Sequence, residues 1–108
     1  MSNSGIGFIG LGQMGLGMAN NLGQVARPFY AYDALPEATK RLEGDDIIIA
    51  SSVSNMAQNC HLIFLCLPSA KEVKEVIFGP EGIVDSALPN LSIIDTSTID
   101  RTEAISIH

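Results

Sequence analysis

The sequence predicts an α/β domain built around a doubly wound, mostly parallel sheet. Short runs that are apolar at nearly every position recur along the chain and alternate with segments of helical spacing. Strands that are apolar throughout are typical of a parallel sheet covered by helices on both faces. The length of 108 residues, of which 46% are hydrophobic, suffices for one core and sets one domain as the upper limit.

The first half of the chain shows this alternation in full. Two short runs are apolar and extended in character, and a third is rich in isoleucine, a residue that favours strands. Pro36 opens a polar segment, which suits the first turn of a helix. The predicted elements are a strand at 6–10, a helix from about 13 to 22, a strand at 28–32, a short helix from about 36 to 42 and a strand at 47–50.

The second half repeats the pattern. We expect a further helix after Asp100, with the hydroxyl residues before it as its cap. Right-handed crossovers between the parallel strands give the doubly wound topology. The predicted elements are one or two helical turns at 53–59, a strand at 61–67, a helix at 71–78 and a strand at 91–95.

The first helix shows one face clearly. Gly15, Met18, Ala19 and Leu22 recur at steps of three and four, so they share one side of the helix. Two of these residues are small, which allows the helix to lie close to the sheet. Gly23 follows at the place where a left-handed cap commonly ends a helix, and we expect such a cap there.

A glycine-rich loop joins the first strand to the first helix and fits the pattern G-x-G-x-x-G. In this context the first glycine allows a tight turn, the second lets a pyrophosphate approach the backbone, and the third allows close packing. The amides at the helix start would face the phosphates. The alternative is a turn that binds no ligand. The predicted phosphate-binding residues of this Rossmann-like domain are Gly10, Leu11, Gly12, Gln13, Met14 and Gly15.

Asp33 ends the second strand, 18 residues after Gly15. A carboxylate here would accept hydrogen bonds from the hydroxyls of an adenosine ribose and would repel a 2′-phosphate, which favours NAD over NADP. Alternatively, Asp33 starts the turn into the next helix, because Asp33 to Pro36 also suits a helix start. Both roles are compatible.

Two further strands end at the same carboxyl edge of the sheet, where open α/β sheets bind ligands. Pro68 ends the ladder of the fourth strand. Thr96, Ser97 and Thr98 follow the fifth strand and could donate hydrogen bonds to a ribose, a carboxamide or a substrate carboxylate. The alternative for each hydroxyl is a helix cap.

Charge and cysteine content exclude several classes of function. Six basic residues stand against twelve acidic ones, for a formal net charge of -6, which argues against nucleic acid and anionic membranes as partners. No apolar run approaches the roughly 20 residues of a membrane span, and we expect no leader peptide before residue 5. The C-x5-C spacing of Cys60 and Cys66 is not a zinc pattern, so we expect two reduced, interior cysteines in a cytoplasmic protein and no metal.

Together these motifs resemble the 3-hydroxyacid (β-hydroxyacid) dehydrogenase family, which includes 3-hydroxyisobutyrate and tartronate semialdehyde dehydrogenases. The resemblance implies that the glycine loop and Asp33 hold the adenosine diphosphate half of NAD. It also implies that Leu67, Pro68 and Thr98 line the nicotinamide half, with Glu72 as a weaker contact. The matching residues are Gly7 to Gly15, Met18 to Leu22, Leu67-Pro68, Val73, Gly79 to Ile83 and Asp95 to Asp100.

The chain departs from the family in two respects. Arg101 stands where relatives often have proline, a small change at an expected helix start. The family's glycine-rich substrate loop, catalytic lysine and helical second domain would all follow His108. We therefore expect residues 1–108 to form a dinucleotide-binding domain, the N-terminal part of a longer enzyme, and assign no catalytic residue. His61, His108 and the lysines at 40, 71 and 74 match no catalytic context.

The resulting hypothesis is the NAD-binding domain of an oxidoreductase that transfers a hydride between a short 3-hydroxy acid and a nicotinamide cofactor. The chain alone would be inactive. The resemblance implies a homo-oligomer for the intact enzyme. One alternative is a nucleotide-binding or interaction module without catalysis. Another is an NADPH-dependent reductase of aldehydes or imines, against which the charge of Asp33 argues.

Overall fold

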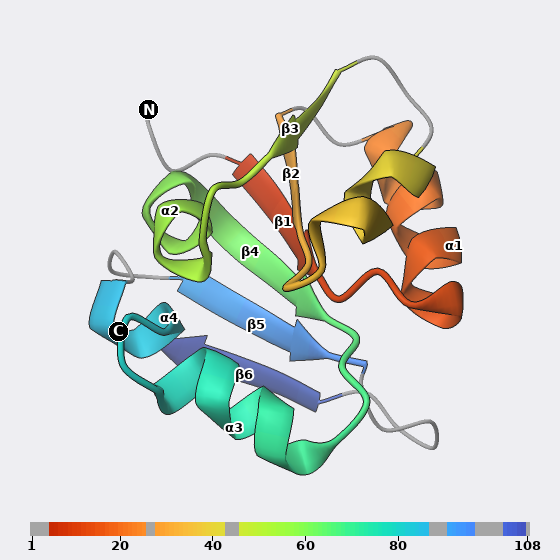
Figure 1. The fold of residues 1–108 in the computed structure, drawn as a ribbon. Helices are drawn as coiled ribbons and strands as arrows, with labels where there is room; N and C mark the ends of the chain where they lie inside the picture. The colour runs from red at the N-terminus through yellow and green to blue at the C-terminus, as the bar shows by residue number, and fades with distance from the viewer. Residues whose placement is uncertain (1–4, 26–27, 43–45, 87–90, 97–102, 108) are drawn as a thin grey trace.

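The computed structural model describes residues 5–25, 28–42, 46–86, 91–96 and 103–107. They form a six-stranded sheet in the order β3-β2-β1-β4-β5-β6, in which five strands are parallel and β6 is antiparallel (Figure 1). This confirms the doubly wound α/β prediction. The strands are β1 (Gly5–Ile9), β2 (Phe29–Tyr32), β3 (Ile47–Ile49), β4 (Cys60–Leu65), β5 (Leu91–Asp95) and β6 (Glu103–Ile107).

Helices lie on both faces of the sheet (Figure 1). One face packs against α1 and the short 3-10 helix η1, and the other packs against α2, α3 and α4. Right-handed crossovers require this division, because the strand order reverses at β1. The helices are α1 (Gln13–Gly23), η1 (Pro36–Arg41), α2 (Val53–Asn59), α3 (Ala70–Phe78) and α4 (Ile83–Ser86).

The core is divided into two clusters by the sheet. Neighbouring residues of β1 point to opposite faces, so Phe8 joins the cluster under α1 and Ile9 joins the cluster under α2 to α4. Ala19 of the predicted helix face is fully buried, and Met18 and Leu22 pack beside it. The small-residue face of the first helix is thereby confirmed.

Hydrogen bonds extend the ladders past the carboxyl ends of the strands. The Gly10 amide donates to the carbonyl oxygen of Tyr32 at 3.0 Å, and the Cys66 amide donates to that of Ile9 at 2.9 Å. The Thr96 amide donates to the carbonyl oxygen of Leu65 at 2.8 Å. The ends of four neighbouring strands are therefore fixed relative to one another at this edge.

The predicted left-handed cap at Gly23 is wrong. Helix α1 includes Gly23, and the amides of Gln24 and Val25 continue its turns by donating to Asn21 and Leu22. A Cβ on Gly23 would lie 3.3 Å from Ile47 Cδ1 and 3.4 Å from a ring carbon of Phe29. Close packing against β2 and β3 therefore accounts for this glycine.

Other predicted elements need smaller corrections. The prediction of a helix after Asp100 is wrong, because residues 103–107 form β6, which pairs with β5, the edge strand of the parallel set. Isoleucine occurs at every second position, 105 and 107, and this alternation is typical of a strand. The strand predicted at 61–67 ends at Leu65. The polar helix from Pro36 has 3-10 geometry. The four-residue helix α4 was not predicted.

Candidate functional site

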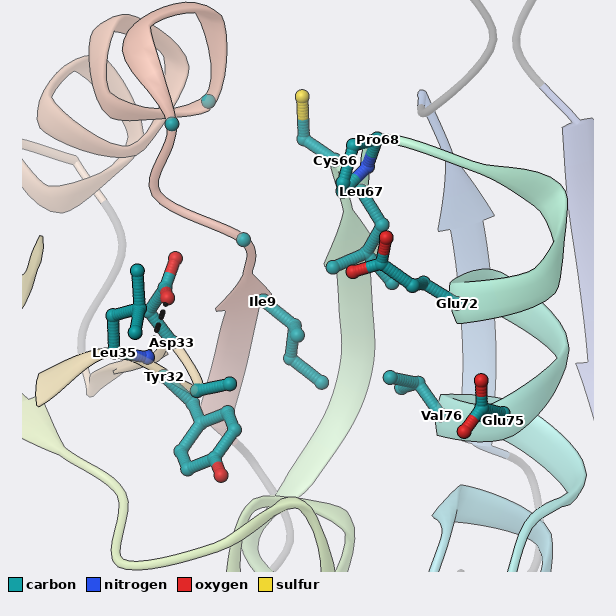
Figure 2. A pocket seen from close by; sticks show the side chains of 14 residues that line it. Ile9, Tyr32, Asp33, Leu35, Cys66, Leu67, Pro68, Glu72, Glu75 and Val76 are labelled. Carbon is teal, nitrogen blue, oxygen red and sulfur yellow. Dashed lines mark hydrogen bonds between the residues drawn. The ribbon is translucent and has the colours of Figure 1, made fainter.

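A cleft of about 640 Å³ opens at the carboxyl ends of β1 and β4. The strand order reverses between these strands, and this is the place where open α/β sheets bind ligands. The volume lies within the roughly 300–1,000 Å³ of small-molecule sites. Figure 2 shows Ile9 between two sides: one carries Tyr32, Asp33 and Leu35, and the other carries Leu67, Pro68, Glu72, Glu75 and Val76.

Two glycines of the loop are required by the fold itself. Gly10 has a φ of 101°, a conformation that favours glycine, and a Cβ there would overlap the carbonyl oxygen of Cys66. A Cβ on Gly15 would overlap the carbonyl oxygen of Gly10. These positions show the tight turn and the close helix packing that the glycine pattern predicts.

Gly12 differs from both neighbours in the motif. It is exposed, lines the cleft, and a Cβ built on it would meet no atom of the described residues within 4 Å. Gly12 is also the N-cap of α1 and provides no side-chain cap, and the first turn of that helix contains no acidic residue. The first amides of a helix have no partner within it, so this end favours an anion. Packing within the described residues gives no reason for glycine at position 12, whereas a phosphate approaching the backbone does.

Asp33 makes two hydrogen bonds through its carboxylate. Its Oδ2 accepts from the Leu11 amide at 2.7 Å, and its Oδ1 accepts from the Leu35 amide at 2.8 Å. The second bond confirms that Asp33 starts the turn toward η1. A carboxylate has about four acceptor sites, so capacity for ribose hydroxyls is left, and that role stays a prediction.

The electrostatic character of the cleft is acidic. Asp33 lies at one side, and Glu72 and Glu75 of α3 lie at the other (Figure 2). Among the described lining residues there is no lysine, arginine or histidine. Lys40 and Arg41 are exposed on η1 and do not line the cleft.

The structure brings most of the predicted site residues together. The residues that line the cleft are Gly10, Gly12, Gly15, Asp33, Leu67 and Pro68, whereas Leu11 is buried in the core under α1. Gln13 and Met14 are the first two residues of α1. Thr98 lies outside the described residues, as do Ser97 and His108, so the prediction for Thr98 stays a prediction.

The expected role of Thr96 needs correction. Its hydroxyl donates to the carbonyl oxygen of Leu65 at 2.6 Å, next to the amide that donates to the same oxygen. The hydroxyl proton therefore joins β4 to β5 and is not available to a ligand.

The two cysteines differ in their surroundings. Both are free, and Cys60 is fully buried, which raises the pKa of its thiol to about 12 by desolvation. Cys66 was predicted within a buried strand, but it follows β4, is half-buried and lines the cleft. The strand β4 ends at Leu65, two residues earlier than predicted.

Several lining residues were not predicted. Ile9, Tyr32, Leu35 and Val76 supply apolar surface, and Glu75 a carboxylate. The α3 residues at 72, 75 and 76 follow helical spacing on one face, a signal that was available once Pro68 was placed at the sheet edge. No sequence signal pointed to Leu35, because the turn at Asp33 determines that this residue lines the cleft.

Within the part of the chain that the structure describes, no helix has the length and apolarity that a membrane crossing requires. The same residues hold no group of three or more His, Cys, Asp or Glu side chains suited to a metal ion.

Comparisons with known proteins agree with this geometry. Residues 5–108 match the family model described as the NAD binding domain of 6-phosphogluconate dehydrogenase. The chain is 37% identical over 99 residues to mitochondrial 3-hydroxyisobutyrate dehydrogenase of Mus musculus, a match that covers 92% of this chain and 30% of that protein. It is 35% identical over 94 residues to 3-sulfolactaldehyde reductase of Escherichia coli (strain K12), covering 87% of this chain and 32% of the reductase.

The fold also matches a solved structure. The 3-hydroxyisobutyrate dehydrogenase of Mycobacterium tuberculosis superposes with a TM-score of 0.76 at 22% identity, over 87% of this chain and 31% of that one. The chain thus spans about a third of the length of these relatives.

Proposed function

Since this chain belongs to the family of the NAD binding domain of 6-phosphogluconate dehydrogenase, we propose that residues 1–108 form the NAD-binding domain of a dehydrogenase for a short 3-hydroxy acid. The matches to 3-hydroxyisobutyrate dehydrogenases support this substrate class. The share of the relatives that is matched supports a longer parent enzyme, with the substrate loop and catalytic lysine outside this chain.

The observation that carries the proposal is the open space at Gly12. Glycine there leaves a path for a phosphate to the amides at the start of α1, which no side chain of Gly12 caps. Gly10 and Gly15 are explained by packing, so Gly12 is the residue that distinguishes a dinucleotide site from a glycine-rich turn.

The charges around the cleft support NAD rather than NADP as the cofactor. Asp33 would accept from ribose hydroxyls at the site where a 2′-phosphate would bring two further negative charges. No cation among the described lining residues offsets that repulsion, and Glu72 and Glu75 lie on the opposite side of the cleft from Asp33.

In the parent enzyme, this domain would bind the cofactor and a second domain would bind the substrate. The nicotinamide ring, when bound, supplies or accepts the hydride. Leu67, Pro68 and Thr98 would contact the nicotinamide half, and the glycine loop would hold the pyrophosphate. This chain would thus orient the cofactor, while groups outside it would bind the 3-hydroxy acid and move the hydroxyl proton.

The test is a pair of titrations of the chain, one with NADH and one with NADPH, followed by nicotinamide fluorescence and calorimetry. We expect saturable binding of NADH and binding of NADPH at least tenfold weaker. Equal affinity would contradict the proposed role of Asp33. Binding of neither cofactor would contradict the proposed function of the domain.

A second candidate is an NADPH-dependent reductase of aldehydes or imines. The 35% identity to 3-sulfolactaldehyde reductase favours an aldehyde as the substrate class. Tighter binding of NADPH than of NADH would support it. A non-catalytic nucleotide-binding module is a further alternative. A catalytic lysine and a glycine-rich substrate loop in the parent's sequence after residue 108 would exclude it.

For the parent protein we also propose a cytoplasmic location and a homo-oligomer, with neither nucleic acid nor membrane as a partner. The free thiols of Cys60 and Cys66 support a reducing compartment, and the acidic charge supports the absence of nucleic acid. Cell fractionation of the parent protein would test its location, and sedimentation would test its oligomeric state.

A further inference from the structure

The carboxylate of Asp33 connects two segments that are far apart in the sequence. Its Oδ2 accepts from the amide of Leu11, 22 positions earlier, at 2.7 Å. Its Oδ1 accepts from the nearby amide of Leu35 at 2.8 Å. The first bond joins the end of β2 to the glycine loop, so this side chain makes a tertiary contact within the chain itself.

That contact is one of two hydrogen bonds that attach the glycine loop to the end of β2. Two consecutive loop amides are bonded to the end of this strand, that of Gly10 to the Tyr32 carbonyl oxygen at 3.0 Å and that of Leu11 to Asp33. The Leu11 side chain is only 1% exposed and packs in the cluster under α1. An amide in such surroundings requires a partner, because an unpaired buried donor is costly.

We propose that Asp33 is a positioning residue that holds the glycine loop on β2 through the Leu11 amide. Gly12 and the first amides of α1 follow directly after Leu11, so the bond also sets where the phosphate-binding amides lie. The consequence for cofactor choice rests on the proposed function. A substitution that removes the Asp33 charge to admit NADPH also releases the loop, so it weakens the binding of both cofactors.

Amide hydrogen exchange of the chain without any nucleotide tests the hydrogen bond directly. In Asp33→Ala we expect exchange at Leu11, measured relative to the Ile63 amide of the core strand β4, to rise about ten- to a hundredfold, as expected for a bond to a charged acceptor. Asp33→Asn keeps one acceptor oxygen and should give a smaller rise. Because the ratio to Ile63 is compared, a general loss of stability does not imitate the result.

Asp85→Asn is the matched control. Its Oδ2 accepts from the Glu81 amide at 3.2 Å at the start of α4, so the substitution removes the same charge and perturbs the same kind of bond outside the cleft. Exchange at Leu11 should be unchanged in this variant. An unchanged ratio in Asp33→Ala would overturn the proposal.

Nucleotide binding separates positioning from ribose recognition. ADP and 2′,3′-dideoxy-ADP share the diphosphate, but the second lacks the hydroxyls that Asp33 would accept from. If Asp33 only binds the ribose, Asp33→Ala weakens ADP and leaves 2′,3′-dideoxy-ADP unaffected, which would overturn the positioning role. We expect Asp33→Ala to weaken both nucleotides, 2′,3′-dideoxy-ADP by at least fivefold. Failure of the unchanged chain to bind either nucleotide would overturn the proposed function, whereas the exchange experiment would still decide the positioning role.

Discussion

At the scale of single residues, glycine is needed at the three glycine positions of the motif for different physical reasons. Gly10 and Gly15 are required because a Cβ at either position would overlap a backbone carbonyl oxygen. Gly12 faces open space at the start of α1. The motif is therefore partly a requirement of the fold and partly a requirement of the ligand.

Gly12→Ala should separate these requirements. The methyl group occupies the path of the phosphate but meets no described atom, so we expect the fold to be retained and NADH affinity to fall at least tenfold. Gly17→Ala is the control, because Gly17 is also exposed, with open space at its Cβ, in the same helix. This control should keep NADH affinity and gain roughly 0.5–1 kcal/mol of stability from better helix propensity. Equal affinities of the two variants would contradict a phosphate site at Gly12.

Cys60 provides a prediction about pH. Burial raises the pKa of its thiol to about 12, whereas the thiol of the unfolded chain has its ordinary pKa of about 9.0. Above pH 9 the unfolded state loses this proton and the folded state keeps it, so ionisation favours unfolding. The free energy of unfolding should fall by up to about 1.4 kcal/mol per pH unit from this group between pH 9 and 12.

The measurement is urea unfolding at pH 8, 9.5 and 10.5 for the unchanged chain and for Cys60→Ala. All other side chains are common to the two proteins, so the difference between the two slopes isolates the thiol. Parallel slopes would show that the Cys60 thiol ionises equally in both states.

At the scale of elements, helix ends determine how the cleft is built. α1 begins at the glycine loop without a side-chain cap, which leaves its first amides to a ligand. α3 begins at Ala70, two residues after the cleft residue Pro68, and is capped by Ser69. The Ser69 Oγ accepts from the Glu72 amide and donates to the Glu72 carboxylate, both at 3.3 Å. One helix end offers amides, and the other holds a carboxylate beside the cleft.

Ser69→Ala should lower both stability and cofactor affinity. Loss of this N-cap should destabilise the chain by about 1 kcal/mol, and a frayed first turn should move Glu72 and weaken NADH binding about two- to fivefold. Ser52→Ala is the matched substitution, since Ser52 caps α2 by accepting from the Asn55 amide at 3.0 Å. It should cost similar stability in thermal unfolding and leave NADH affinity unchanged. Equal affinity losses would indicate that α3 does not contribute specifically.

At the scale of the whole molecule, the sheet brings together segments that are separated by more than half of the chain. The glycine loop, the end of β2 and the start of α3 meet because β1 lies between β2 and β4. The two-sided core holds these strand ends in place. Cofactor binding should therefore stabilise the domain as a unit.

NADH should raise the free energy of unfolding of the chain by about 2.7 kcal/mol at a hundred times its dissociation constant, because it binds the folded state alone. The midpoint of thermal unfolding should rise with the logarithm of NADH concentration. NADPH at the same concentration should raise the midpoint less. In the Gly12→Ala variant, neither cofactor should raise the midpoint of thermal unfolding by much. A midpoint that is independent of NADH would contradict a preformed cleft.

Hydride transfer by this chain alone should be undetectable with 3-hydroxyisobutyrate and NAD. The described lining of the cleft includes no lysine or histidine to move the hydroxyl proton. Absorbance at the NADH band, measured at high protein concentration, would check this. Measurable turnover would contradict the view that catalysis needs groups outside this chain.

The sequence by itself determined the architecture and the glycine loop. Apolar runs alternating with helical spacing predicted five strands and most helices, because burial of parallel strands on both faces leaves a pattern in any sequence that forms them. The glycine spacing predicted the loop, since tight turns and close approaches restrict the residue type. Asp33 was found by its distance from that loop.

Tertiary structure decided the rest. Whether Gly23 serves as a cap or as a packing site depended on Ile47 and Phe29, which lie far along the chain. Whether 103–107 forms helix or strand depended on the free edge of β5. The Thr96 hydroxyl and the second role of Asp33 depended on partners 31 and 22 positions away. Local pattern determines what a segment can form, but a hydrogen-bond partner distant in sequence is fixed only when the strands are assembled.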